Sequence, residues 1–146
     1  MKRVTRAQVQ ALAGNFGVTT ALVQAVFYIA TGIWPWLSMP IFLKVTGPKQ
    51  DLWLVKTLGA LITVVGVVLG VAALRRRVTP EIALLAAGSA GSLAGADLLF
   101  VSQKRIPPIY LLDMVVELGL AGGWYLSWRR DLRLSAGGGN NVHVRH

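Results

Sequence analysis

The chain has 146 residues, of which 54% are hydrophobic and only 14% charged, and its mean hydropathy is +0.57. A soluble domain carries about 25% charged residues, so this composition excludes a fully water-exposed globular surface and predicts an integral membrane protein. Disulfides, thiol catalysis and thiolate metal sites are excluded because the sequence has no cysteine.

The net charge of +9 comes from basic residues that cluster at the edges of apolar runs. This placement indicates membrane topology and contact with anionic lipid headgroups, and we expect no nucleic-acid partner. Both histidines, His143 and His146, lie in a polar tail, so a haem or metal held by histidine within the membrane is also excluded unless that tail folds back.

Residues 1–15 are basic and mildly amphipathic, which predicts a helix on the membrane surface. Residues 16–36 form the first apolar segment, long enough to cross a hydrocarbon core of about 30 Å. Polar or small residues at spacings of three and four give this segment one polar stripe, which we expect to face the interior of the bundle. The stripe consists of Gly17, Thr20, Gln24, Tyr28 and Thr31.

Residues 35–52 contain three of the six prolines, so we expect that no straight helix continues here and that the segment lies along the interface or dips slightly into the membrane. Residues 53–74 are the second predicted span. Its polar and small side chains follow the alternating three-and-four spacing of a left-handed helix pair. They are Lys56, Gly59, Thr63, Gly66 and Gly70.

Three arginines end the second span, and Thr79 followed by Pro80 is a helix start signal. Residues 81–101 are the third predicted span. Small residues occur on both of its sides, which predicts a central helix that packs on two neighbours. The helix-packing glycines that we expect in the chain are Gly59, Gly66, Gly70, Gly88, Gly91, Gly95, Gly119 and Gly123.

Residues 107–128 are the fourth predicted span, and residues 129–146 form a basic, Gly/Asn-rich tail that we expect to be disordered by itself. The sequence thus predicts an all-α, four-helix transmembrane bundle over residues 16–128. Ten of the fifteen Lys and Arg residues fall on the side of the two termini. By the positive-inside rule, both termini are expected to be cytoplasmic, in a multi-pass protein of the bacterial inner membrane.

Four ionisable residues lie inside the apolar segments: Lys56, Asp97, Asp113 and Glu117. A charge in hydrocarbon costs about 2.5–3.5 kcal/mol, so it must face a partner, a cavity or water. The predicted topology places all four in the outer half of the bilayer at similar depths. Two interpretations stay open: an ion-pair network that fixes helix register, or a site for protons, a cation or a cationic ligand.

The chain resembles the DoxX-like group of small four-span bacterial membrane proteins. The resemblance lies in the layout: four spans, a Pro-rich outer segment, Trp53 to Gly59 opening the second span, and glycine-spaced second and third spans. That group includes subunits of quinone-linked oxidoreductases, which implies a role beside an energy-converting complex. The resemblance carries over no residue-level motif.

No catalytic motif, metal-ligand spacing or phosphate loop is present, so we expect neither an enzyme nor a cofactor. The favoured prediction is an accessory subunit that contacts membrane lipids and docks on other membrane protein subunits. The alternative is a small carrier or ligand-binding protein that uses the outer acidic cluster. Its candidate site residues are Lys56, Asp97, Asp113, Glu117, Gln24, Tyr28 and Tyr110.

Overall fold

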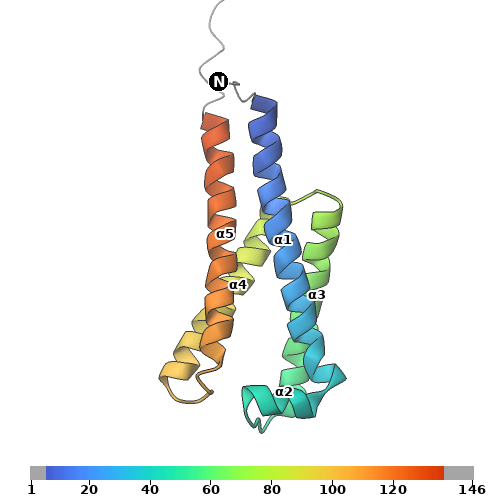
Figure 1. Cartoon of the computed structure of the whole chain (residues 1–146), viewed down its shortest axis with the longest axis vertical. Coiled ribbons are helices and arrows are strands. Elements are labelled where there is room, and N and C mark those ends of the chain that lie inside the picture. Colours follow the sequence, from blue (N-terminus) through green and yellow to red (C-terminus); the bar gives the residue numbers. More distant parts are fainter. Residues whose placement is uncertain (1–5, 137–146) are drawn as a thin grey trace, which may run out of the picture.

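The computed structural model describes residues 6–136, and within them the chain forms five helices and no strand (Figure 1). The helices are α1 (Arg6–Leu37), α2 (Met39–Thr46), α3 (Leu52–Leu74), α4 (Pro80–Ser102) and α5 (Tyr110–Ala136). The all-α prediction is therefore confirmed. The predictions for residues 1–5 and 137–146 lie outside the described residues.

Three of these helices are long and apolar enough to cross a membrane: Asn15–Leu37, Leu52–Leu74 and Pro80–Ser102, each with 23 residues. At 1.5 Å per residue each is about 34 Å long, which matches a hydrocarbon core. The chain is thus a multi-pass helical membrane protein. The fifth helix is long enough as well, but it carries Asp113 and Glu117 and is not among these three apolar helices.

The observed helix ends differ from the predicted ones at both ends of the chain. From Arg6 onward the expected surface segment is continuous with the first span, as one helix of 32 residues. Pro35 lies in its last turn, and the helix ends two residues later. The last helix continues past the predicted end at residue 128 to Ala136, so the start of the basic tail is helical.

Helices α1 and α3 form the closest pair, because glycine occurs on both sides of their contact. A Cβ atom at Gly59 would lie 2.5 Å from the backbone oxygen of Gly32. At Gly66 a Cβ would lie 3.1 Å from the backbone oxygen of Ala25. The three-and-four seam predicted for the second span is therefore a packing seam, apart from Lys56 near the N-terminal end of α3.

Helix α4 pairs mainly with α5 and does not lie at the centre of the bundle, so the prediction of a central third span was wrong. The central helix is α1, which contacts all four others. Helix α4 buries one alanine face, at Ala86, Ala90 and Ala94. The opposite face of α4 carries Gly88, Gly91 and Gly95. A Cβ atom at any of these positions, or at Gly119 on α5, would have no neighbour within 4 Å in the described chain.

The α1–α3 pair and the α4–α5 pair meet midway and separate toward the end that carries α2 (Figure 1). At the other end lie the start of α1 and the end of α5. Further along α1, Arg76 donates a 3.3 Å hydrogen bond to Asn15, and the Arg130 guanidinium lies 4.5 Å from the ring centre of Phe16. These arginines mark the level at which the apolar part of α1 begins.

Candidate functional site

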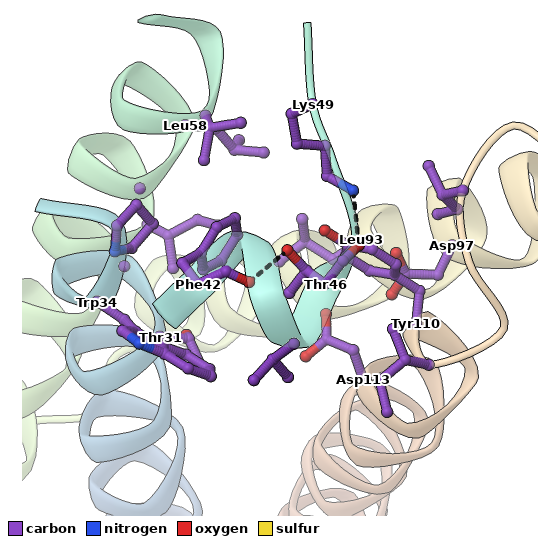
Figure 2. A pocket seen from close by; sticks show the side chains of 18 of the residues that line it. Thr31, Trp34, Phe42, Thr46, Lys49, Leu58, Leu93, Asp97, Tyr110 and Asp113 are labelled. Carbon is purple, nitrogen blue, oxygen red and sulfur yellow. Dashed lines mark hydrogen bonds between the residues drawn. The ribbon is translucent and has the colours of Figure 1, made fainter. Parts of the chain in front are cut away.

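A partly open cavity of about 580 Å³ lies where the two helix pairs separate, and all five helices contribute to its lining. Helix α2 and the segment after it extend across this space. Gly47 ends α2, and its φ of +83° is a backbone conformation that glycine adopts more easily than other residues. Figure 2 shows Phe42, Thr46 and Lys49 reaching into the cavity from this segment, opposite Asp97 and Asp113.

Three predicted acids line the cavity together: Asp97 from α4, and Asp113 and Glu117 from α5. Asp113 and Glu117 are four residues apart, so they lie on one helix face. Glu117 is 1% exposed and accepts a 3.0 Å hydrogen bond from the Tyr28 hydroxyl of α1. The three acids that the sequence places at similar depths therefore line one cavity.

Asp97 is the least satisfied of the acids. Its side chain is 8% exposed, and its Oδ2 atom has no hydrogen-bond partner among the described residues. A buried charged oxygen without a donor is costly, since it has lost water and gained no replacement. This oxygen has almost no accessible surface, so it does not face the open part of the cavity, and the Asp97 carboxyl group lies beside that of Asp113.

The cavity wall opposite the acids is mainly apolar and aromatic. Trp34 and Phe42 stack edge to face with ring centres 5.7 Å apart. Leu58 of α3 adds aliphatic surface to this wall, whereas Leu93 of α4 lies four residues before Asp97 and so on the side of the acids (Figure 2). A binding space of this kind has an apolar body and one acidic side.

Lys49 is the one basic side chain among the described residues that line the cavity. Its ammonium group donates a 2.9 Å hydrogen bond to the carbonyl of Thr46 and lies 4.8 Å from the ring centre of Tyr110. Tyr110, a predicted site residue, thus supplies an aromatic face to a cation. Asp51 lines the same cavity, so four carboxyl groups share it with one ammonium group.

Lys56 does not join the acids, contrary to the sequence prediction. Its ammonium group lies 5.2 Å from the ring centre of Trp36, and its side chain is not part of the cavity lining. The indole N–H of Trp36 donates to the Lys56 carbonyl at 3.1 Å. Lys56 lies on the α1–α3 side of the space, and the acids lie on the α4–α5 side, so the separation of the pairs keeps them apart.

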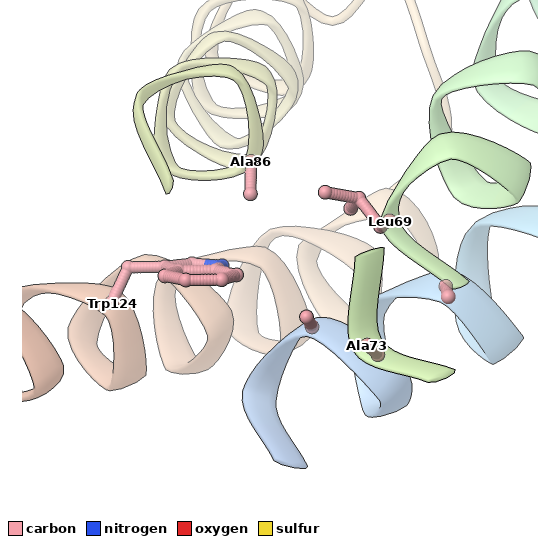
Figure 3. Close-up of a cluster of buried hydrophobic side chains, with 6 residues drawn as sticks. Leu69, Ala73, Ala86 and Trp124 are labelled. Atoms are coloured by element: carbon pink, nitrogen blue, oxygen red, sulfur yellow. The ribbon is translucent and has the colours of Figure 1, made fainter. Parts of the chain in front are cut away.

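Gln24 is part of a structural connection and not of the cavity. Its amide donates to the Ala86 carbonyl of α4 at 2.9 Å, and its oxygen accepts from the Trp124 indole of α5 at 2.6 Å. The side chain is fully buried, so both amide ends are used inside the protein. Figure 3 shows Trp124 beside Ala86 and Leu69, in the apolar cluster that joins the two helix pairs.

Four residues that line the cavity were not predicted as site residues from the sequence: Lys49, Asp51, Trp34 and Phe42. A signal for the first two existed: the polar run from Lys49 to Asp51 follows a Gly-Pro turn between two apolar segments. The aromatic pair had no comparable signal, because interfacial tryptophan is common in membrane proteins.

The cavity lacks the donor set of a metal site. Within residues 6–136 no three Asp, Glu or His side chains come close enough to hold a metal ion together. The arrangement instead combines four carboxyl groups, one ammonium group and an aromatic wall, which suits binding and proton exchange. Comparisons of this chain with known protein families, with curated proteins and with solved structures find no match.

Proposed function

We propose that this chain is a four-span protein of the bacterial inner membrane that binds a small ligand in the cavity between its helix pairs. The cavity itself is the observation that supports this proposal most strongly. Its volume of about 580 Å³ lies within the range of about 300–1,000 Å³ that is typical of small-molecule sites. Apolar walls with a few convergent polar groups are the usual composition of such sites.

The buried acids argue for a binding role over a purely structural one. An ion-pair network that fixed helix register would need a basic partner for the acids, and Lys56 contacts Trp36 instead. Lys49 is held by Thr46 and Tyr110. The acids therefore line the open space, and neither lysine is paired with them.

We further propose that α5 is the fourth span and that both termini are cytoplasmic. The supporting observations are that the start of α1 and the end of α5 lie at one end of the molecule (Figure 1), and that Arg76 and Arg130 contact α1 where its apolar part begins. With this orientation the cavity opens in the outer half of the bilayer. The carboxyl groups of Asp113 and Glu117 then face the cavity and not lipid.

Filling the cavity is expected to abolish ligand-induced stabilisation. Leu58 lines the cavity, whereas Leu61, one turn further on the same helix, does not and is 61% exposed. Three probes share a phenylbutyl body and carry an amine, an alcohol or a carboxylic acid. We expect at least one of them to raise the melting temperature of the wild type in lipid nanodiscs. Leu58→Trp is expected to remove this shift and Leu61→Trp to retain it.

The same melting curves can contradict the prediction of a small-molecule site. Equal shifts in Leu58→Trp and Leu61→Trp would mean that the probes act through the lipid or another surface. No shift with any probe in the wild type would remove the support for a small-molecule site.

An accessory subunit is the second candidate function, and one observation favours it. Gly88, Gly91 and Gly95 form an open face on α4, and a Cβ at any of them would have no neighbour within 4 Å. Small residues on a membrane helix permit close approach of another helix. If this function holds, gentle purification from native membranes should yield a stoichiometric membrane partner, and Gly91→Leu should release it.

A further inference from the structure

We propose that a second cavity, which lies between the α2–α3 and α4–α5 connections, binds the headgroup of an anionic phospholipid such as phosphatidylglycerol. Its volume is about 400 Å³, which is within the size range of small-molecule sites. Two consecutive cations, Lys104 and Arg105, line it beside three prolines and two aliphatic side chains. It shares only Ile106 with the acidic cavity, so this site lies outside the proposed function.

The turn after α4 brings the two cations to one place. Lys104 has a φ of +56°, and its amide donates to the Val101 carbonyl at 2.9 Å. The Arg105 amide donates to the Phe100 carbonyl, also at 2.9 Å. This pair of hydrogen bonds is a Schellman motif, in which glycine usually takes the left-handed position. A lysine in that position costs backbone free energy, and its side chain lines the cavity together with that of Arg105.

The α2–α3 connection forms the other side of this cavity. Pro48 lines it, directly after Gly47. A Cβ atom at Gly47 would lie 2.8 Å from Cγ of Pro107, so the two connections approach each other closely. Pro48, Pro107 and Pro108 supply no backbone N–H donor. Binding of an anion here therefore depends on the side chains of Lys104 and Arg105.

The charge and the level of the two cations match a phospholipid phosphate. Lys104 and Arg105 follow the apolar helix Pro80–Ser102 by two and three residues, where hydrocarbon gives way to headgroups. An arginine binds phosphate through paired N–H groups, and a lysine binds it as a point charge. The described chain contributes no acid to the lining, so a zwitterionic headgroup would find no partner for its own cation.

The same motif at the end of α3 provides a comparison. Arg76 takes the left-handed position there, with a φ of +51°, and its side chain donates to Asn15 of α1. That cation thus has a partner within the protein. Lys104 and Arg105 instead line a space that is open to an occupant.

The apolar part of the lining favours a lipid over a free phosphate ion. Val101, Ile106 and Pro107 are partly buried and line the cavity beside the cations. A hydrated phosphate ion gains nothing from such surface, whereas the glycerol and first acyl carbons of a lipid would remove it from water. Basic pockets beside membrane helices are suited to anionic lipid headgroups for this reason.

The ratio of two lipids retained by the purified chain tests this site. The full chain in neutral detergent micelles is incubated with equal amounts of phosphatidylglycerol and phosphatidylcholine that carry the same acyl chains, and bound lipid is counted by native mass spectrometry. We expect the wild type to prefer phosphatidylglycerol by at least about fivefold, which is the effect of one cation near an anionic surface. Glycerol 3-phosphate, a headgroup phosphate without acyl chains, should not displace it.

Lys104→Gly and Arg105→Gln remove the cations one at a time, and each is expected to lower the preference about fivefold. Glycine suits the left-handed position, so Lys104→Gly should melt at the wild-type temperature or above, which shows that the variant is folded. Lys44→Gln is the matched control. Lys44 is an exposed cation in the last turn of α2 and lines neither cavity, so this variant should keep the preference within about twofold.

Three results would overturn the proposal. A wild type without preference, or a preference that both Lys104→Gly and Arg105→Gln retain, would show that this cavity does not bind the headgroup. An equal loss in Lys44→Gln would show that the preference follows total charge and not the cavity. Displacement by glycerol 3-phosphate would make the occupant a soluble phosphate ester and not a lipid.

Discussion

Gln24→Leu is expected to lower the free energy of unfolding by about 1–3 kcal/mol, because it leaves a buried indole N–H without an acceptor. In the wild type, Trp124 of α5 donates to Gln24 at 2.6 Å, and Gln24 donates to Ala86 of α4. Leucine has nearly the same size, so the loss comes from hydrogen bonding and not from a cavity. Ala86 retains a 3.0 Å hydrogen bond from the Ser89 hydroxyl.

A double-mutant cycle with Trp124→Phe isolates this interaction. Since removal of both partners leaves no unpaired group, we expect the double variant to lose less stability than the sum of the single variants. The coupling should be at most about 1.7 kcal/mol, the upper value measured for hydrogen bonds between membrane helices. Additive losses, measured by reversible unfolding in mixed micelles, would show that the Gln24–Trp124 bond does not join the helix pairs.

Gly59→Ala is expected to destabilise the α1–α3 pair by about 1–3 kcal/mol, since one methyl group would collide with backbone. The added Cβ would lie 2.5 Å from the oxygen of Gly32, and neither backbone can move without separating the helices. Gly91→Ala is the control, because nothing lies within 4 Å of its Cβ position. We expect that variant to be as stable as the wild type or slightly more stable.

The same unfolding measurement decides this prediction. If Gly59→Ala matched Gly91→Ala, the close approach of α1 and α3 would be incorrect. A loss confined to Gly59→Ala would support the seam that Gly59, Thr63, Gly66 and Gly70 form along α3.

The parts of the fold that follow from one helix at a time could be predicted from the sequence. The polar stripe on the first span is buried at Gly17, Thr20, Gln24 and Tyr28, because a helix carries residues three and four apart on one face. The start of α4 is also as expected: the Thr79 hydroxyl accepts a hydrogen bond from the Ile82 amide at 3.4 Å.

The parts that depend on how helices pair could not be predicted in the same way. Small residues on two sides of α4 suggested a central helix, yet only the alanine face is covered and Gly88, Gly91 and Gly95 stay open. Lys56 has the right depth to meet the acids, but depth does not fix the direction of a side chain. The divergence of the two pairs places Lys56 at Trp36.

Only part of the acidic site could be predicted, because the positions of its acids follow from single helices whereas the cavity depends on how the helices pair. Asp113 and Glu117 share a face because they are four residues apart, and burial of Asp97 follows from its place in line with Ala90 and Ala94. The cavity itself depends on α2 and on the Lys49–Asp51 segment crossing between helix pairs. No periodic pattern encodes that crossing.

We propose that water and small molecules reach the acidic cavity from the outer side of the membrane. The chain has no native cysteine, so single-cysteine variants report accessibility without a background signal. Leu93 lines the cavity, whereas Leu84 on the same helix is 74% exposed on a face without a partner and is expected to face lipid.

The most direct measurement is the rate at which a charged, membrane-impermeant methanethiosulfonate reagent modifies Leu93→Cys in intact cells. We predict modification of Leu93→Cys at least about tenfold faster than of Leu84→Cys, because such a reagent requires water at the thiol. An unreactive Leu93→Cys beside an equally unreactive Leu84→Cys, in protein shown to be folded, would contradict the open cavity.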